Sequence, residues 1–352
     1  MGYEYKELAS ETQVSTIRGT SSTFYRNSPV MWGGDLVDAA QNNLFFLQAV
    51  DVRYLPEGMA QLVVKKRNNY LGGSGVTFDT SEATTADITN TAINNLDGVV
   101  ISPTVCNAHV TITNFAIRTN IFDLVAEARN ELSYALADRV DAAIALAIGD
   151  ATETTSSAAG AQTIYGGDAT SDTTLASGDI LTPALVTKAA RLLKDNKAYY
   201  WSSTTFTLSA DTKNPWNNSP DDPYILFVGP AQENALRDSS QFTNASEYGG
   251  REVVLNGEIG KFMGIKIVVA NNVERVAAAG TSPDGASTTG AAMTRCLLVK
   301  AKKAYCFVWG EEPRFTIAPV EVRAQKAVVL ESAYAGSVVH ADAVIKIDVA
   351  DD

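Results

Sequence analysis

The stretch from Asn256 to Val269, NGEIGKFMGIKIVV, holds the residues most typical of phosphate binding. Gly257, Gly260 and Gly264 lie three and four residues apart, and a lysine follows the second glycine. A Walker loop needs G-x-x-x-x-G-K-[ST], and a dinucleotide loop needs G-x-G-x-x-G between a strand and a helix. Neither template fits, because phenylalanine follows the lysine and a strand-like run follows the last glycine. We therefore predict a tight hairpin, with Gly264 at a bulge or close backbone approach.

A thiol and an imidazole lie close in sequence at Cys106 and His109. On a strand, residues three apart point mostly to opposite faces, which is poor geometry for a nucleophile and its base. His340, the only other histidine, also lies in a strand pattern. We predict packed or half-exposed strand histidines, and no serine stands in G-x-S-x-G.

Carboxylates recur along the most helical segment of the chain. On a helical wheel they fall within an arc of roughly 80°; they are Asp123, Glu127, Glu131, Asp138 and Asp141. Di-metal bundles use Glu-x-x-His, and this segment has no histidine. The row is therefore interpreted as a solvated helix face.

Oxygen ligands also gather in residues 211–223, DTKNPWNNSPDDP. The glycine and terminal glutamate of an EF-hand are missing, so a polar, turn-rich loop is the better interpretation. The sequence predicts no catalytic, cofactor-binding or metal-binding residue, and hence no enzyme.

Basic side chains are densest in residues 63–69, VVKKRNN, at Lys65, Lys66 and Arg67. Three charges are a weak nucleic-acid signal, and they could equally pair with an acidic patch of a neighbouring subunit. The whole chain has 28 basic and 40 acidic residues, a net charge of −12. This balance argues against a protein that grips nucleic acid, although it allows a shell that surrounds DNA.

Three cysteines without metal-like spacing, Cys106, Cys296 and Cys306, indicate free thiols in a reducing compartment. The first residues lack the basic and apolar regions of a signal peptide. No apolar run reaches the roughly 20 residues of a membrane helix. We expect a soluble protein, intracellular when made, without a membrane partner.

The elements that must position these residues begin with an arm. Residues 1–45 show no sustained periodic pattern of apolar residues, and we expect them to become ordered only against another surface. Two strand-like runs follow, DVRYLPEGMAQLVVKKRN and TVCNAHVTITNFAIRTN, joined by a connector of about 30 mostly polar residues. This pattern predicts an extended hairpin, or flap, with little core of its own.

A long helix is predicted over IFDLVAEARNELSYALADRVDAAIALAIGD, with Asn120 as its cap and Gly149 at its end. About 29 helical residues give roughly 43 Å, the length of a spine on which other elements lean. Arg139 lies inside the apolar arc of this helix. We expect it to meet a carboxylate from another element or another subunit.

A mixed unit follows a polar excursion over 151–180. Thr182 and Pro183 predict the start of a second helix, and YILFVGPAQENALRDSSQF predicts strand, turn and helix, with Pro230 at the helix start. From residue 295 the chain ends in β-type runs. Because the flap strands and these closing strands flank the mixed unit, that unit is predicted to be an insertion into the unit that carries the spine helix.

Three stretches together resemble the major capsid proteins of tailed viruses, which have the HK97 fold, and within them the coat proteins of the N-four-like phages. They are VRYLPEGMAQLVVKKRNNYL, VTITNFAIRTNIFDLVAEARNELSYALADRVDAAIALAI with Asp141 late in the helix, and GPAQENALRDSSQFTNASEYGGREVVLNGEIGKFMGIKIVVANNV. The third is the most specific. NFAIRTN departs from the family where a Tyr-Gly is expected.

The resemblance implies an α+β fold. Its parts are an N-terminal arm (1–49), an extended loop with flanking strands (50–118), the spine helix and surface loop of a peripheral domain (119–180), an axial domain (181–293), and closing strands of the peripheral domain (294–352). Gly257, Gly260 and Gly264 become part of the axial-domain signature. Some members cross-link a lysine to an asparagine, for which Lys65 or Lys66 is the candidate, although nothing identifies the asparagine.

The implied function is self-assembly into hexamers and pentamers of an icosahedral shell that encloses double-stranded DNA without reading its sequence. Portal, decoration and scaffolding proteins are the implied partners, and the implied location is the virion, after synthesis in the host cytoplasm. Since no long helical extension precedes the arm, we expect scaffolding from a separate protein. Two alternatives stay open: an encapsulin-type compartment with enzyme cargo, and a secreted acidic surface-layer or adhesin protein.

Overall fold

The computed structural model describes residues 44–67, 96–120, 123–150, 163–196, 224–239, 261–262, 265–281, 288–320 and 323–351. All of them belong to one compact unit, Asn42–Asp352. The described helices are α3 (Phe46–Ala49), α4 (Asn114–Thr119), α5 (Leu124–Gly149), α6 (Pro183–Asp195) and α7 (Pro230–Arg237), with short 3-10 helices η1 (Asp172–Thr174) and η4 (Ala341–Ala343). The described strands are β1 (Asp51–Tyr54), β2 (Leu62–Arg67), β3 (Leu96–Ile101), β4 (Thr104–Thr113), β5 (Thr163–Tyr165), β6 (Tyr224–Val228), β7 (Lys261–Phe262), β8 (Ile265–Val269), β9 (Arg275–Val276), β10 (Met293–Lys300), β11 (Tyr305–Val320), β12 (Gln325–Val338) and β13 (Val344–Ala350).

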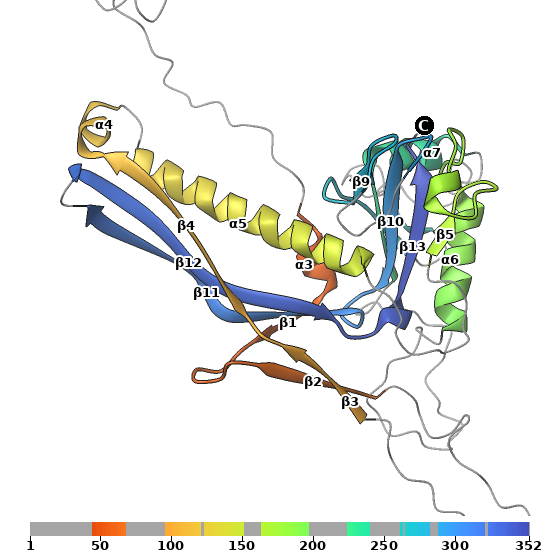
Figure 1. Ribbon diagram of the computed structural model, residues 1–352, viewed down its shortest axis with the longest axis horizontal. Helices are drawn as coiled ribbons and strands as arrows, with labels where there is room; N and C mark the ends of the chain where they lie inside the picture. Colours follow the sequence, from red (N-terminus) through yellow and green to blue (C-terminus); the bar gives the residue numbers. More distant parts are fainter. Residues whose placement is uncertain are drawn as a thin grey trace, which may run out of the picture. The chain divides into compact units, whose positions relative to one another are not determined.

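A four-stranded sheet in the order β1-β11-β12-β4 supports the long helix α5 (Figure 1). β11, β12 and β4 are antiparallel neighbours, while the short β1 runs parallel to β11. α5 contacts β12 and β4. Its Leu132 and Leu136 belong to the same core as Val328 and Leu330 of β12, because alternate strand residues share one face.

The larger sheet has seven strands, in the order β5-β13-β10-β6-β8-β7, with β9 also paired to β10. β6 and β8 are parallel and are joined through α7, whereas β10 is antiparallel to both of its long neighbours, β6 and β13. Every residue of β10 and β13 is buried. Strands covered on both faces have near-continuous apolar sequences, which explains the runs around CLLV and VIKI.

β2 and β3 form a separate two-stranded antiparallel ribbon. One face of the ribbon is buried: Val64 and Ile101 pack with Cys306, Val308 and Val339 in a second apolar cluster. The opposite face is open, where the directly paired Val63 and Val100 are 51% and 54% exposed. The ribbon therefore has a base on the four-stranded sheet and an uncovered apolar face.

The spine helix is confirmed, but its predicted start at Asn120 is wrong. α5 begins at Leu124, because the Asp123 carboxylate accepts hydrogen bonds from the backbone N–H groups of Val125 and Ala126. Asn120 instead ends α4. Gly149 is the last helical residue, as predicted, and the 26 residues of α5 span about 39 Å.

The strand predicted to continue through NFAIRTN is also wrong, because residues Asn114–Thr119 form α4. The Thr113 hydroxyl accepts a hydrogen bond from the Ala116 N–H and starts a helical turn. Elsewhere the local signals are confirmed: α6 begins at Pro183 with Thr182 as its cap, and α7 begins at Pro230.

The closing strands divide between the two sheets. β11 and β12 join the sheet under α5, whereas β10 and β13 pair within the seven-stranded sheet. Residues 294–352 were expected to return together to the peripheral domain, so the observed pairing differs from that expectation. The domain boundaries themselves stay a prediction. Within the described part of the chain, no helix has the length and apolar character needed to cross a membrane.

Candidate functional site

Asp141 of α5 is buried and joins three segments that are far apart in sequence. Its Oδ1 accepts a hydrogen bond of 2.8 Å from the backbone N–H of Phe46, at the start of α3. α3 has no side-chain cap of its own, so the carboxylate of another helix takes that role. Burial raises the pKa of Asp141, while hydrogen bonds from Asn272 and from the Phe46, Leu47 and Phe45 backbone oppose the rise.

Asn272, in the turn after β8, completes this contact, which we call the Asp141 junction (Phe46, Asp141 and Asn272). Its Nδ2 lies 3.2 Å from Asp141 Oδ2 and 3.1 Å from Asp138 Oδ1. The Phe46 ring stacks on Phe227 of β6 at a centroid distance of 4.2 Å. The junction therefore connects α3, the spine helix and the seven-stranded sheet.

The predicted solvated row of carboxylates is wrong at this residue. Asp123 and Glu131 are exposed on α5, as expected. Asp141 is 1% exposed, because α3 and the turn after β8 cover this side of the helix. A helical wheel cannot predict this burial, since it takes no account of other segments.

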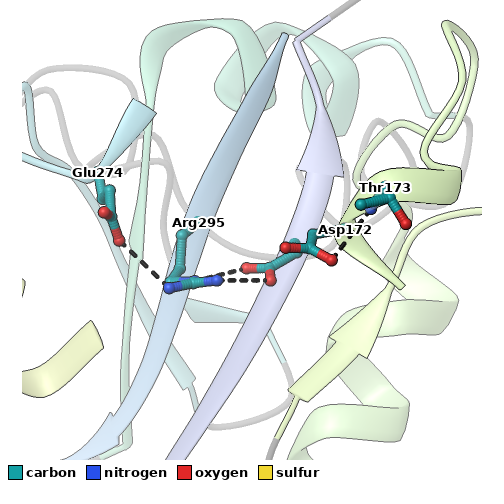
Figure 2. A network of polar contacts seen from close by, with 5 residues as sticks. Asp172, Thr173, Glu274 and Arg295 are labelled. Atoms are coloured by element: carbon teal, nitrogen blue, oxygen red, sulfur yellow. Dashed lines mark hydrogen bonds and ion pairs between the residues drawn. The ribbon is translucent and has the colours of Figure 1, made fainter. Parts of the chain in front are cut away.

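A second polar contact joins β10, β13 and the segment before β9 in the seven-stranded sheet (Figure 2). The Arg295 guanidinium binds Asp348 with two hydrogen bonds of 2.8 and 2.9 Å, and its Nη1 lies 3.3 Å from Glu274 Oε2. All three side chains are at most 9% exposed. A Cβ placed on Gly149 would lie 3.6 Å from Arg295 Cδ. Gly149, the last residue of α5, therefore lies next to this buried ion pair.

Asp351 is held beside the same sheet by three side chains. It accepts hydrogen bonds from the Thr294 hydroxyl, from Gln232 Nε2 at 2.9 Å and from Arg275 Nε at 3.1 Å. Burial raises the pKa of Asp351, but the hydrogen bonds from Thr294, Arg275 and Gln232 outweigh it, so the pKa lies below its ordinary value of 3.8. The ionised carboxylate therefore stabilises the folded state.

We expect Asp351→Asn to weaken the folded state at neutral pH and to flatten its acid dependence. A depressed pKa contributes stability that is present above the unfolded value of 3.8 and is lost as pH falls through the folded value. The free energy of unfolding should drop by about 1–2 kcal/mol at pH 6, with the difference disappearing as pH falls below the lowered folded pKa of Asp351. Urea unfolding of unassembled subunits across this range measures it. Asp195→Asn, at an exposed carboxylate, is the control, and an equal effect of both variants would contradict the assignment.

The candidate nucleophiles do not form a reactive site among the described residues. Cys106 is half-buried towards the core and His109 is exposed, as expected for strand residues three apart. Burial raises the pKa of the Cys306 thiol to about 11 and raises that of Cys296 further. All three cysteines are free, and no group of three or more metal-ligating side chains lies in the described part.

The predicted assembly residues lie in separate places. Lys65 is exposed on the ribbon, and Lys66 and Arg67 continue β2. Gly257, Gly260 and Gly264 lie outside the described residues, as does the loop 211–223. β7 and β8 pair as antiparallel strands on either side of Gly264. The roles predicted for these glycines and basic residues stay predictions.

Arg139 reaches an aromatic hydroxyl rather than the expected carboxylate. It hydrogen-bonds the Tyr334 hydroxyl of β12 and so ties α5 to the four-stranded sheet. Burial and the nearby Cys106 raise the pKa of Tyr334, and this hydrogen bond opposes the rise. The predicted contact of Arg139 with another subunit stays untested.

Sequence reasoning missed four of the residues that connect these elements: Phe46, Asn272, Arg295 and Asp348. A signal existed for the last two. Each is a charged residue inside a mostly apolar strand run, where a buried charge needs a partner of opposite sign. Asn272 lies in a polar turn and Phe46 in the expected arm, so neither stands out from its neighbours.

Comparisons with known proteins point to one class. The phage capsid protein family model matches residues 110–347, and no curated protein matches the chain. The capsid of Ralstonia phage GP4 has a TM-score of 0.61 at 15% identity, covering 94% of this chain and 96% of that chain. The Cyanophage Pam1 capsid has a TM-score of 0.63 at 14% identity, covering 94% and 99%. The mature capsid of bacteriophage PhiM1 has a TM-score of 0.62 at 17% identity, covering 92% of each chain.

These structural likenesses establish the fold, the HK97-type α+β fold that the sequence predicted. The family match runs from within β4 to within β13. It includes the spine helix, most strands of both sheets, Asp141, Asn272 and Arg295, while Phe46 and Asp348 lie outside it. Because the match covers well over half of the sequence, this chain belongs to the phage capsid protein family.

Proposed function

We propose that this chain is a major capsid protein that assembles into hexamers and pentamers of an icosahedral shell enclosing double-stranded DNA. It acts as a structural protein and not as an enzyme, and it contacts DNA without reading its sequence. Portal, decoration and scaffolding proteins are its further partners. It is made in the host cytoplasm and functions in the virion.

The observation that carries this proposal, beside the family, is apolar surface that the folded chain leaves uncovered. Val63 and Val100 face outward on the ribbon, Val105 on β4 is 73% exposed, and Phe115 on α4 is 77% exposed. These side chains lie at separate places, on the ribbon, on β4 and on α4, and exposed apolar surface of this kind marks contact sites. A subunit of a closed shell covers such surfaces with copies of itself.

Charge favours the same arrangement. Every copy has a net charge of −12, so copies repel one another unless opposite charges meet locally. The ribbon carries Lys65 and continues into Lys66 and Arg67, while α5 exposes Asp123 and Glu131. We propose that the basic ribbon of one copy lies near an acidic surface of the next, which would set the register of contacts more than their strength.

Expression of the full chain alone, followed by sedimentation and negative-stain imaging, tests this function. We expect closed shells or capsomers with five- and six-membered rings. Nuclease-protected DNA inside shells purified from the natural host distinguishes a virus capsid from a compartment with enzyme cargo. A strictly monomeric, compact product at every protein concentration, salt concentration and level of crowding would contradict the proposal.

A further inference from the structure

Among the strands that the structure describes, all sheet edges but one carry a feature that hinders pairing with another strand. An edge strand presents unpaired backbone N–H and C=O groups to which another strand can pair, and proteins block such edges with short strands, charges, prolines or bulges. The seven-stranded sheet ends in β5 and β7, which are three and two residues long. The ribbon carries Lys65, Lys66 and Arg67 on β2, and Asp97 and Gly98 on β3.

The two edges of the four-stranded sheet, β1 and β4, differ in how well they are protected against pairing with another strand. One side is formed by β1, four residues long, and beyond it by the outer part of β11. There β11 has two register shifts, between Trp309 and Glu311 and between Glu311 and Arg314, and it contains Pro313 and Pro319. Bulges and prolines of this kind prevent another strand from pairing.

The other edge is β4, which is not short and has no bulge, proline or fixed charge. It is ten residues long, TVCNAHVTIT, with no proline, no glycine and no acidic, lysine or arginine residue. Its register with β12 is continuous from Thr104 to Thr113. In the described part of the chain no strand pairs with its outer edge. Most of its side chains are exposed, so α5 leaves this edge accessible.

From this contrast we infer that β4 is a strand-pairing interface, whose occupant is a strand from a second copy of the chain. The inference rests on the proposed function and names one of its contacts. Charge supports a second copy as occupant, because like-charged subunits approach with least repulsion where the surface carries no charge. A strand pairing there continues the sheet and satisfies backbone groups with which no described strand pairs.

Hydrogen exchange of assembled shells, compared with unassembled subunits, tests the pairing directly. About half of the β4 amides point away from β12. We expect exchange of these amides in the 104–113 peptide to slow by at least about tenfold on assembly. The 311–320 peptide of β11, with its guarded outer edge, is the internal control and should change much less.

A matched pair of lysine substitutions tests the same edge by mutation. Thr111 and Thr316 are both exposed threonines in the same sheet, on β4 and on the guarded part of β11. Thr111→Lys introduces an edge charge, and we expect it to reduce the assembled fraction by about tenfold. Thr316→Lys should assemble like the parent chain, and circular dichroism should show both variants folded.

The outcomes separate this inference from the proposed function. Shells in which the 104–113 amides exchange as fast as in unassembled subunits would overturn the inference and leave the function standing. The same holds if both lysine variants assemble equally well. Protection that requires a second, different protein would exclude a copy of this chain as the occupant. If no shells form under any condition, the function and this contact fail together.

Discussion

Arg295→Ala should lower the free energy of unfolding by about 3–5 kcal/mol, the usual effect of breaking a buried ion pair by removing one partner. The change leaves the Asp348 and Glu274 carboxylates, 1% and 9% exposed, without the cation they share. Urea unfolding of unassembled subunits measures the loss, and thermal unfolding should shift in parallel.

Two controls identify the cause of that loss. Arg314→Ala removes an arginine that contacts Glu331 and Glu311 on the surface, and we expect no measurable change because exposed ion pairs contribute little. The triple variant Arg295→Met, Asp348→Leu and Glu274→Leu replaces the cation and both of its buried carboxylate partners with apolar side chains and should recover much of the stability. A loss in the triple variant as large as in Arg295→Ala would instead assign the effect to packing.

What the sequence predicted correctly depends on neighbours along the chain. Thr182 followed by Pro183, and Gly229 followed by Pro230, start helices because capping and a fixed φ are local properties. The strand character of β6, β8 and β10–β13 follows from β-branched and apolar composition. The start of α5 was misplaced only because Asn120 and Asp123 are both good caps, and the choice depends on α4 between β4 and α5.

What the sequence could not predict depends on which segments meet in space. The pairing of β10 with β6 and β13 joins residues separated by long stretches of chain. The apolar sequence of a buried strand does not indicate which other strands pair with it. Asp141 has the same helical position as exposed carboxylates, and its burial is set by α3 and Asn272. Of the Asp141 junction, the sequence therefore singled out Asp141 alone, and it predicted neither Phe46 and Asn272 nor the contact that the three residues form.

The Asp141 junction provides the other large expected effect. Asp141→Ala removes the acceptor for the Phe46 N–H and for Asn272 Nδ2, and leaves both donors near a buried gap. Losing a charged acceptor and exposing such groups should reduce the free energy of unfolding by about 3 kcal/mol. Glu131→Ala, at an exposed acid of the same helix, should stay within about 0.5 kcal/mol. Urea unfolding of unassembled subunits measures both.

The effect of Asp141→Ala should also be local, because the carboxylate is the only side-chain cap that α3 receives among the described residues. Hydrogen exchange should accelerate first in the peptide over residues 45–50, while β10 and β13 keep their protection. Asp141→Asn keeps an oxygen for the Phe46 N–H but turns an amide towards Asn272, so its loss should be intermediate. Since α3 is the last part of the predicted N-terminal arm, loosening it should reduce shell yield more than Arg295→Ala does at equal loss of stability. Equal exchange in the 45–50 peptide of the parent chain and of Asp141→Ala would show that this carboxylate does not hold α3 in place.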